Sequence, residues 1–183
     1  YEEPKLKMMG IEAVKSSTPA PCRTMIKDAL KLMMRGTEDD VIEFIENARK
    51  EFKSLPPEEI AFPRTASNVQ KYKSSSDIYV KGTPIHIRGA LLFNYYLRKK
   101  KLTNKYSAIE NGEKIKFLYL KKPNTIQENV LSFIQDFPTE FGLSQYIDYE
   151  LQFEKSFVYP LKAILDAIGW EVEKKVTLES FFS

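Results

Sequence analysis

The sequence is poor in the residues that metals and disulfides need: its 183 residues include one cysteine, Cys22, and one histidine, His86. A single cysteine excludes a disulfide framework and a cysteine-based zinc site within the chain. No apolar run approaches the length of a membrane span, and no secretory signal is visible, so we expect no membrane partner. The chain does not begin with Met, so we expect it to be a piece of a longer protein.

Patterns that bind nucleotides or activate nucleophiles are also missing. No two glycines lie two residues apart, which excludes a dinucleotide-binding fingerprint and a phosphate-binding loop. His86 has no accompanying Gly-x-Ser-x-Gly elbow. Asp148 and Glu150 are carboxylates spaced two residues apart, but side chains two positions apart on a helix point to different faces, so they are poor joint metal ligands. We therefore expect no catalytic centre and no cofactor in this chain.

Charge is nearly balanced in number but uneven in distribution. There are 28 Lys and Arg against 25 Asp and Glu, a net charge of +3. Acidic residues gather in Glu38–Glu51. Basic residues gather elsewhere, in Lys71–Lys73, Arg98–Lys101, Lys114–Lys122 and Lys174–Lys175. This asymmetry allows a basic face on a nearly neutral protein.

The first third of the chain predicts a strand and two helices. Leu6 and Met8 alternate with lysines, which predicts a strand over residues 6–14 with a bulge at Met9-Gly10. Thr18 as N-cap and Pro19 as first residue predict a helix that ends at Gly36.

Thr37 caps a second helix, which Pro56-Pro57 stops. Because the connection is short, we expect an antiparallel helical hairpin. The apolar stripe of the second helix consists of Val41, Phe44, Ile45, Ala48 and Phe52.

The rest of the chain predicts further helices around a small antiparallel β-element, with Asn111-Gly112 as a hairpin turn. The predicted order is a surface loop over 64–82 with one helical turn near 67–72, a helix over 84–101, a strand over 115–120, a short helix over 127–134 and a long helix over 144–168. The predicted fold class is thus α+β, mainly helical, with a helical hairpin, a long C-terminal helix and a flexible tail.

Five groups of segments follow one another along the chain: Glu3–Glu12 with Ser16–Pro19, Ile85–Gly89, Gly112–Ile115 with Leu120–Asn124, Phe153–Phe157 with Pro160-Leu161, and Thr177–Phe182. In this order they resemble the C-terminal thumb region of family B replicative DNA polymerases of the T-even phage type. The third resembles a thumb hairpin in a form associated with marine phages. The resemblance implies three parts: the palm–thumb junction strand over 1–15, the thumb domain over 16–170 and a clamp-binding tail over 171–183.

The resemblance implies a parent enzyme that copies DNA with two Mg²⁺ ions held by palm aspartates. The Asp-Thr-Asp motif of that palm is absent here, so catalysis cannot be assigned to any residue of this chain. The implied role is to grip primer–template duplex DNA behind the active site. The implied partners are that duplex, the sliding clamp and the rest of the polymerase (palm, fingers and exonuclease), in the cytoplasm of an infected bacterial host.

A thumb that lets any sequence pass must contact phosphates, because phosphates carry no sequence information. Such contacts suit Lys, Arg, Ser and Asn, and Lys155 matches a basic position that the resemblance places on DNA. One turn further the family has a second basic residue, where this chain has Tyr159. The predicted DNA-binding residues are Lys15, Arg64, Ser67, Asn68, Lys71, Lys73, Lys81, His86, Arg88, Lys121, Lys122 and Lys155.

Alternatives remain open for each group. Residues 64–73 also fit a solvated connector, and one of His86 and Arg88 also fits a core position. The run Arg98–Lys101 ends a predicted helix, where cations offset the helix dipole and need no ligand.

The tail places three apolar residues, Leu178, Phe181 and Phe182, at i, i+3 and i+4. One helical turn capped by Thr177 would bring them to one side, as a sliding-clamp anchor requires. The alternative is that the two phenylalanines fold back onto the long helix.

Three functions fit the sequence. The first is the DNA-binding module of a polymerase, the second is a stand-alone, non-enzymatic clamp-binding accessory protein, and the third is a separately encoded C-terminal subunit of a split polymerase.

Overall fold

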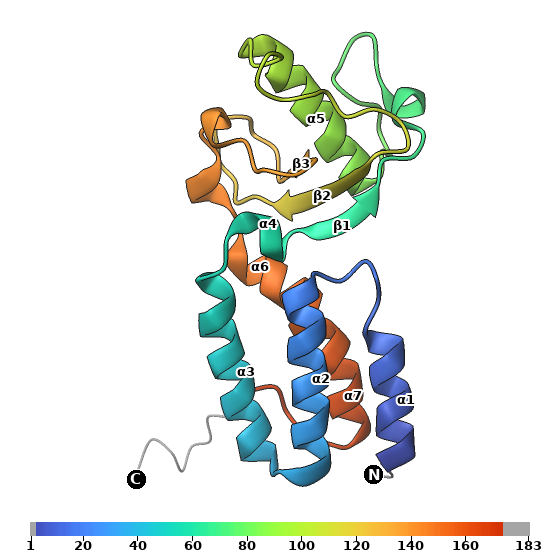
Figure 1. Ribbon diagram of the computed structural model, residues 1–183, viewed down its shortest axis with the longest axis vertical. Helices are drawn as coiled ribbons and strands as arrows, with labels where there is room; N and C mark the ends of the chain where they lie inside the picture. The colour runs from blue at the N-terminus through green and yellow to red at the C-terminus, as the bar shows by residue number, and fades with distance from the viewer. Residues whose placement is uncertain (1–2, 174–183) are drawn as a thin grey trace. The chain divides into compact units, whose positions relative to one another are not determined.

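The computed structural model describes residues 3–173, apart from the side chain of Glu3 (Figure 1). The predicted clamp anchor, Leu178, Phe181 and Phe182, lies outside the described residues. The chain forms two compact units, each described by itself below: unit 1 comprises residues 1–55 and 153–183, and unit 2 comprises residues 56–152.

Unit 1 is helical. It contains α1 (Glu3–Ala13), α2 (Ala20–Arg35) and α3 (Glu38–Lys53). Its second stretch of chain begins at the last residue of α6 (Tyr149–Phe153) and continues through a π-helical turn, η4 (Glu154–Val158), into α7 (Tyr159–Ala167). Helices α2 and α3 run antiparallel, side by side, which confirms the predicted hairpin (Figure 1).

Local sequence explains the hairpin. Gly36 follows α2, and Thr37 and Asp40 form a reciprocal capping box at the start of α3, as Thr37 Oγ1 accepts from the Asp40 N–H and Asp40 accepts from the Thr37 N–H. The stripe of α3 is buried at Val41, Ile45, Ala48 and Phe52. Aromatic rings complete the core, with ring centroids 5.2 Å apart for Phe52–Phe153 and 5.0 Å for Phe153–Phe157.

Two expectations for unit 1 are wrong. Residues 6–14 do not form a strand, because α1 occupies residues 3–13. Leu6 and Gly10 are buried, whereas Met8 and Ile11 are 63% and 76% exposed, so burial recurs every four residues and not every two. A helix satisfies its own backbone hydrogen bonds, while a lone strand needs a partner.

The second wrong expectation concerns the start of α2, where the N-cap is Pro19 and not Thr18. Thr18 is buried in the preceding turn, where its N–H donates to the carbonyl of Lys15 (3.0 Å).

Unit 2 combines a three-stranded antiparallel sheet with helices. The sheet has the order β1 (Phe62–Thr65), β2 (Lys114–Tyr119), β3 (Val130–Phe133), and α5 (Ile85–Lys99) packs on β3 (Figure 1). The short elements are α4 (Pro57–Ile60) and the 3₁₀ turns η1 (Val69–Tyr72), η2 (Thr139–Phe141) and η3 (Ser144–Tyr146). The mainly helical α+β class predicted from the sequence is confirmed.

A close contact joins α5 to the sheet. The Ser132 hydroxyl donates to the His86 carbonyl (2.8 Å), and a Cβ added at Gly89 would lie 2.7 Å from the Ser132 backbone nitrogen. Side by side on the sheet, Phe62 pairs with Phe117, and their rings stack with centroids 5.1 Å apart. Both features require small or flat groups at fixed positions of the sequence.

Three expectations for the second half of the chain need correction. The predicted helix over 127–134 is β3, because all four residues of Val130–Phe133 are buried, and a short continuous apolar run fits an interior strand as well as a helix. Asn111-Gly112 is not a tight hairpin turn, because the strand before it that pairs with β2 is β1, which already ends at Thr65. The predicted long helix begins at Tyr149 and not at Ser144, since η3 and an extended Ile147 precede it.

The described residues include no helix that is both long and apolar enough to cross a membrane.

Replacing Gly89 with Ala should destabilise unit 2. Overpacking costs about 1–3 kcal/mol, and contact with backbone atoms of a buried strand puts the cost near the top of that range. It should exceed the gain of about 1 kcal/mol from replacing a helical glycine with Ala. Urea unfolding would measure the loss, with Arg98→Ala on the exposed end of α5 as the control. Equal stability of Gly89→Ala and wild type would contradict the close contact.

Candidate nucleic-acid interface

The two units carry equal numbers of basic residues, but only unit 2 has a net positive charge. Residues 56–152 contain 14 Lys and Arg against 10 Asp and Glu, a net charge of +4, whereas the remaining residues contain 14 against 15, a net charge of −1. Unit 2 also carries ten of the twelve predicted DNA-binding residues.

The loop that follows β1 is ordered by hydrogen bonds to the turn that precedes β2. The Gly112 N–H donates to the Ala66 carbonyl (2.7 Å), and the Ala66 N–H donates to the Glu113 carbonyl (2.8 Å). Asn68 has a left-handed backbone (φ 59°), and its N–H donates to the Asn111 side chain. The loop is therefore a built structure, and it exposes the predicted residues Ser67, Asn68, Lys71, Lys73 and Lys81.

A second built turn presents the next pair of lysines. Asn124 is 6% exposed, and its amide nitrogen donates to the carbonyls of Lys121 (2.8 Å) and Glu128 (2.7 Å). The Lys121 N–H donates to the Tyr146 carbonyl (2.6 Å). Lys121 and Lys122 project from this turn and are exposed.

Five exposed lysines of these two segments lack an acidic partner. Within residues 3–173, no carboxylate lies within 4 Å of the ammonium group of Lys71, Lys73, Lys81, Lys121 or Lys122. Their charges are therefore not neutralised by the described protein and remain available to an anionic partner.

Arg64 and His86 are half-buried neighbours. The Arg64 guanidinium lies over the rings of Phe62 (5.5 Å) and Phe117 (5.2 Å) and donates to the Pro63 carbonyl (2.7 Å). Burial lowers the pKa of His86, and the nearby Arg64 charge lowers it further, while a hydrogen bond with the Thr65 backbone acts in the opposite direction. At neutral pH His86 is therefore an uncharged group on the flank of Arg64.

Arg88 is half-buried and takes part in an ion pair. Its Nη1 lies 3.1 Å from Oε2 of Glu128, whose Oε1 accepts from the Tyr79 hydroxyl (2.7 Å). The guanidinium carbon lies 5.6 Å from the centre of the Tyr79 ring. Burial and the Glu128 carboxylate raise the pKa of Tyr79, so its proton stays in this hydrogen bond. Neither of the sequence alternatives fits fully, because both His86 and Arg88 lie between surface and core.

Lys15 and Lys155 belong to unit 1. Lys15 is exposed in the turn after α1, and Lys155 is exposed on the π-helical turn η4. Tyr159, at the position where the resemblance implies a second basic residue, is 54% exposed.

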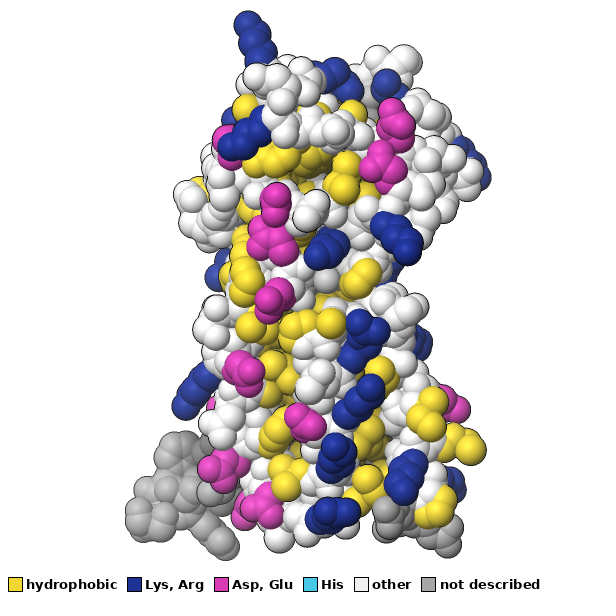
Figure 2. Space-filling view, viewed as in Figure 1, with side chains coloured by type: hydrophobic (Ala, Val, Ile, Leu, Met, Phe, Trp, Pro, Cys, Tyr) yellow, Lys and Arg dark blue, Asp and Glu magenta, His cyan; other side chains and the backbone are white. Residues whose placement is uncertain are grey.

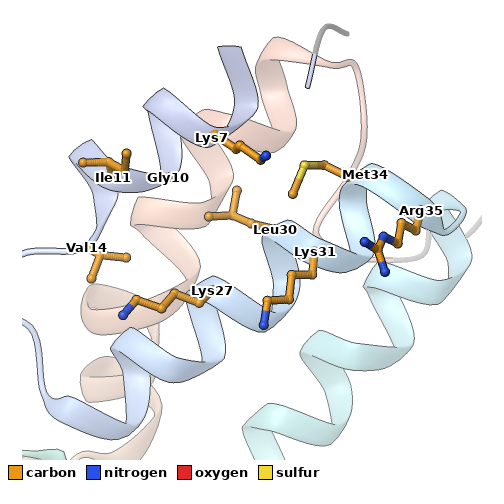
Figure 3. A pocket seen from close by; sticks show the side chains of 9 residues that line it. All are labelled: Lys7, Gly10, Ile11, Val14, Lys27, Leu30, Lys31, Met34 and Arg35. Carbon is orange, nitrogen blue, oxygen red and sulfur yellow. The ribbon is translucent and has the colours of Figure 1, made fainter. Parts of the chain in front are cut away.

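A basic groove in unit 1 was not predicted from the sequence. It has a volume of about 770 Å³, lies between α1 and α2, and combines an apolar floor that includes Leu30 and Met34 with basic side chains at its rim (Figure 3). Three of these, Lys27, Lys31 and Arg35, recur every four residues on α2, and Figure 2 shows a row of Lys and Arg over this helix. That spacing is visible in the sequence, but it is not a consecutive basic run.

No group of three or more His, Cys, Asp and Glu residues suited to a metal ion occurs among the described residues. Burial raises the pKa of Cys22 to about 11, so its thiol stays protonated at neutral pH.

The stability of unit 2 should fall as the pH drops from 7.5 to 5.5. Folding lowers the pKa of His86 from its ordinary value of about 6.5. At a pH near or below that value the unfolded chain therefore binds more protons than the folded protein, which favours unfolding. His86 is the one histidine, so His86→Gln should remove the part of this dependence that titrates near pH 6. Urea unfolding at both pH values measures the change. An unchanged pH dependence in His86→Gln would show that the imidazole is not shielded from protonation.

Comparison with known proteins places these features in context. No protein-family model matches the chain. Over 186 residues it is 29% identical to the DNA-directed DNA polymerase of Enterobacteria phage T4, and over 187 residues it is 32% identical to that of Escherichia phage RB69. Both alignments cover 100% of the chain and 20% of the relative, so the chain spans about a fifth of the length of the curated relatives that it matches. The resemblance to T-even phage DNA polymerases that the sequence motifs predicted is confirmed along the whole chain.

Proposed function

We propose that this chain is the thumb region of a phage DNA polymerase and that unit 2 binds the sugar–phosphate backbone of primer–template duplex DNA. The observation that carries the proposal is the set of five exposed lysines without acidic partners, held on two hydrogen-bonded segments of unit 2. The full-length similarity to two phage DNA polymerases gives these lysines a polyanionic partner of the right kind.

The residue types fit contact without sequence readout. Lysine is a point charge on a flexible stem, so it follows a phosphate without fixing the base beside it. The exposed Ser67 and Asn68 add neutral donors next to Lys71 and Lys73. A polymerase thumb needs this combination, because the duplex must slide past it one base pair at a time whatever its sequence.

The half-buried residues have a different task. The Arg64 guanidinium lies over the rings of Phe62 and Phe117 and donates to the Pro63 carbonyl, so its position is fixed before any ligand binds. Neutral His86 beside it adds a hydrogen-bond donor or acceptor without adding charge. We propose that Arg64 and His86 set the orientation of the bound backbone, while the lysines supply most of the electrostatic attraction.

The chemistry of nucleotide addition belongs, in this proposal, to the rest of the polymerase. Palm carboxylates would hold the Mg²⁺ ions there, in the cytoplasm of the infected bacterium. The twelve predicted residues, including Lys15 and Lys155 of unit 1, would hold the duplex. The tail residues Leu178, Phe181 and Phe182 would tether the enzyme to a sliding clamp, which raises the effective concentration of DNA.

Removing two lysines should weaken duplex binding in a salt-dependent way. The slope of log K against log salt is negative, and each lost phosphate contact makes it shallower by roughly 0.9, so Lys121→Ala with Lys122→Ala should make it shallower by about 1.8. The change should be the same for duplexes of unrelated sequence. Fluorescence anisotropy between about 50 and 200 mM salt measures it.

Arg98→Ala is the matched control, because Arg98 is an exposed cation in the last turn of α5, where it offsets the helix dipole. It should change the slope much less than the loss of one predicted contact. A slope that is equal in wild type and in the double variant would contradict the placement of these lysines on DNA.

Deleting residues 177–183 should abolish binding to the cognate sliding clamp and leave duplex affinity nearly unchanged. Aromatic anchors usually dominate such binding, so loss of Phe181 and Phe182 removes most of its free energy. Calorimetry of full-length and truncated chains against the clamp measures the first effect. Intact clamp affinity together with a melting temperature lowered by several degrees would show instead that the phenylalanines belong to the core.

A further inference from the structure

The acidic side chain of Glu128 is paired with one of the predicted DNA-binding residues of unit 2, Arg88. Glu128 accepts a hydrogen bond from the Tyr79 hydroxyl at one carboxylate oxygen (2.7 Å) and pairs with Arg88 Nη1 at the other (3.1 Å). The side chains of Arg88 and Glu128 are 22% and 18% exposed, so the pair is accessible from solvent at its edge. An arginine carries five N–H donors, and this contact uses one of them.

We propose that Glu128 is an internal competitor for DNA phosphate: it holds Arg88 in the free protein and yields the guanidinium to the duplex backbone on binding. The inference rests on the proposed function, because it concerns the same surface. It identifies a residue that limits the grip of that surface and that a search for basic residues does not find.

The carboxylate holds Arg88 where a phosphate would hold it. Carboxylates and phosphates present the same pattern of acceptor oxygens to a guanidinium, so the exchange keeps the geometry and replaces one anion with another. Because Arg88 is shielded on one side by the Tyr79 ring, its contact is worth more than that of a fully exposed cation. Because Arg88 must first leave Glu128, its net contribution to the free energy of duplex binding is smaller than that of an unpaired arginine.

Glu128 also connects the segments that carry the lysines. Its backbone carbonyl accepts from Asn124, which also holds Lys121, and its side chain reaches Tyr79, which pairs with Lys73 across an antiparallel bridge. Release of Arg88 leaves these backbone links in place. The site can thus gain or lose one cation without losing the arrangement of its exposed lysines.

A loosened contact suits a protein that must hold a duplex and let it slide. Each time the phosphate leaves, Glu128 recaptures Arg88, so the desolvated charge is never left without a partner. The bound and free states thereby differ less in free energy than they would with an unpaired arginine.

The test is Glu128→Gln in the full 183-residue chain, measured by anisotropy against duplex DNA over a range of salt. Glutamine keeps an acceptor for Tyr79 but removes the charge. We expect tighter binding by about threefold to tenfold and a slope of log K against log salt that is steeper by roughly 0.9, since Arg88 then releases a full counterion.

Glu140→Gln is the matched control. Glu140 also accepts from a tyrosine and pairs with a cation, at 3.2 Å from the Tyr106 hydroxyl and 3.2 Å from Lys105 Nζ, and neither partner is a predicted DNA-binding residue. The two variants change the net charge of unit 2 equally. The difference between them isolates the local effect at Arg88.

A second variant keeps the inference testable if Glu128→Gln alone is poorly folded. In an Arg88→Ala background Glu128→Gln should leave the slope unchanged, and in the unaltered protein the Arg88 side-chain ¹⁵N resonance should shift when duplex is added. Failure of the wild-type chain to bind duplex would overturn the proposed function itself. Wild-type binding with equal slopes for Glu128→Gln and Glu140→Gln, or an unmoved Arg88 resonance, would overturn the inference alone.

Discussion

Helix α5 approaches β3 closely because position 89 carries no side chain. A Cβ there would lie 2.4 Å from the Ser132 hydroxyl and 2.7 Å from the Ser132 nitrogen, distances at which atoms overlap. The same serine donates to the carbonyl of His86, in the first turn of α5. The contact therefore fixes both the height of the helix above the sheet and its rotation. This contact also places the neighbouring side chains of His86 and Arg88, which precede Gly89 on α5, at the edge of the core.

Buried and half-buried amide side chains fix the connecting segments of unit 2 in the same way. Gln152 accepts from the Tyr119 N–H (2.9 Å) and donates to the Ile60 carbonyl (2.9 Å), and Asn94 both donates to and accepts from the backbone of Ile109. An amide side chain presents one acceptor and two donors, so it can satisfy backbone groups that no strand or helix reaches. Together with Asn124, these residues turn long connectors into ordered supports for the exposed lysines.

The sequence predicts the helices of this fold better than its strands. Stripes such as Val41, Ile45 and Phe52, with a cap at Thr37, leave little choice, because only a helix brings them to one face. Residues 6–14 and 127–134 were assigned wrongly, because short apolar segments fit either period, and tertiary contacts decide between them. Which strand pairs with which depends on residues far apart in the sequence, and no local pattern in Phe62–Thr65 predicts its pairing with β2.

The site divides along similar lines. Clusters of lysine between predicted elements identify exposed cations, because such residues seldom enter a core. The half-buried position of Arg64 could not be predicted, since it depends on the rings of Phe62 and Phe117, which meet only in the folded sheet. Glu128 was passed over because it is acidic, although the charge that matters at Arg88 is the sum of both side chains.

Two kinds of cation on one surface have distinct physical consequences. The exposed lysines lose little hydration and little freedom when a phosphate approaches, so their attraction is broad, long-ranged and sensitive to salt. The half-buried arginines have lost much of that hydration and freedom on folding, so their contacts are directional and depend on the partner that they leave. A surface built only from the first kind would attract a duplex without orienting it, and one built only from the second would hold it in one place. Lysines on ordered turns around arginines with internal partners combine attraction with release, as the proposed contact with a moving backbone requires.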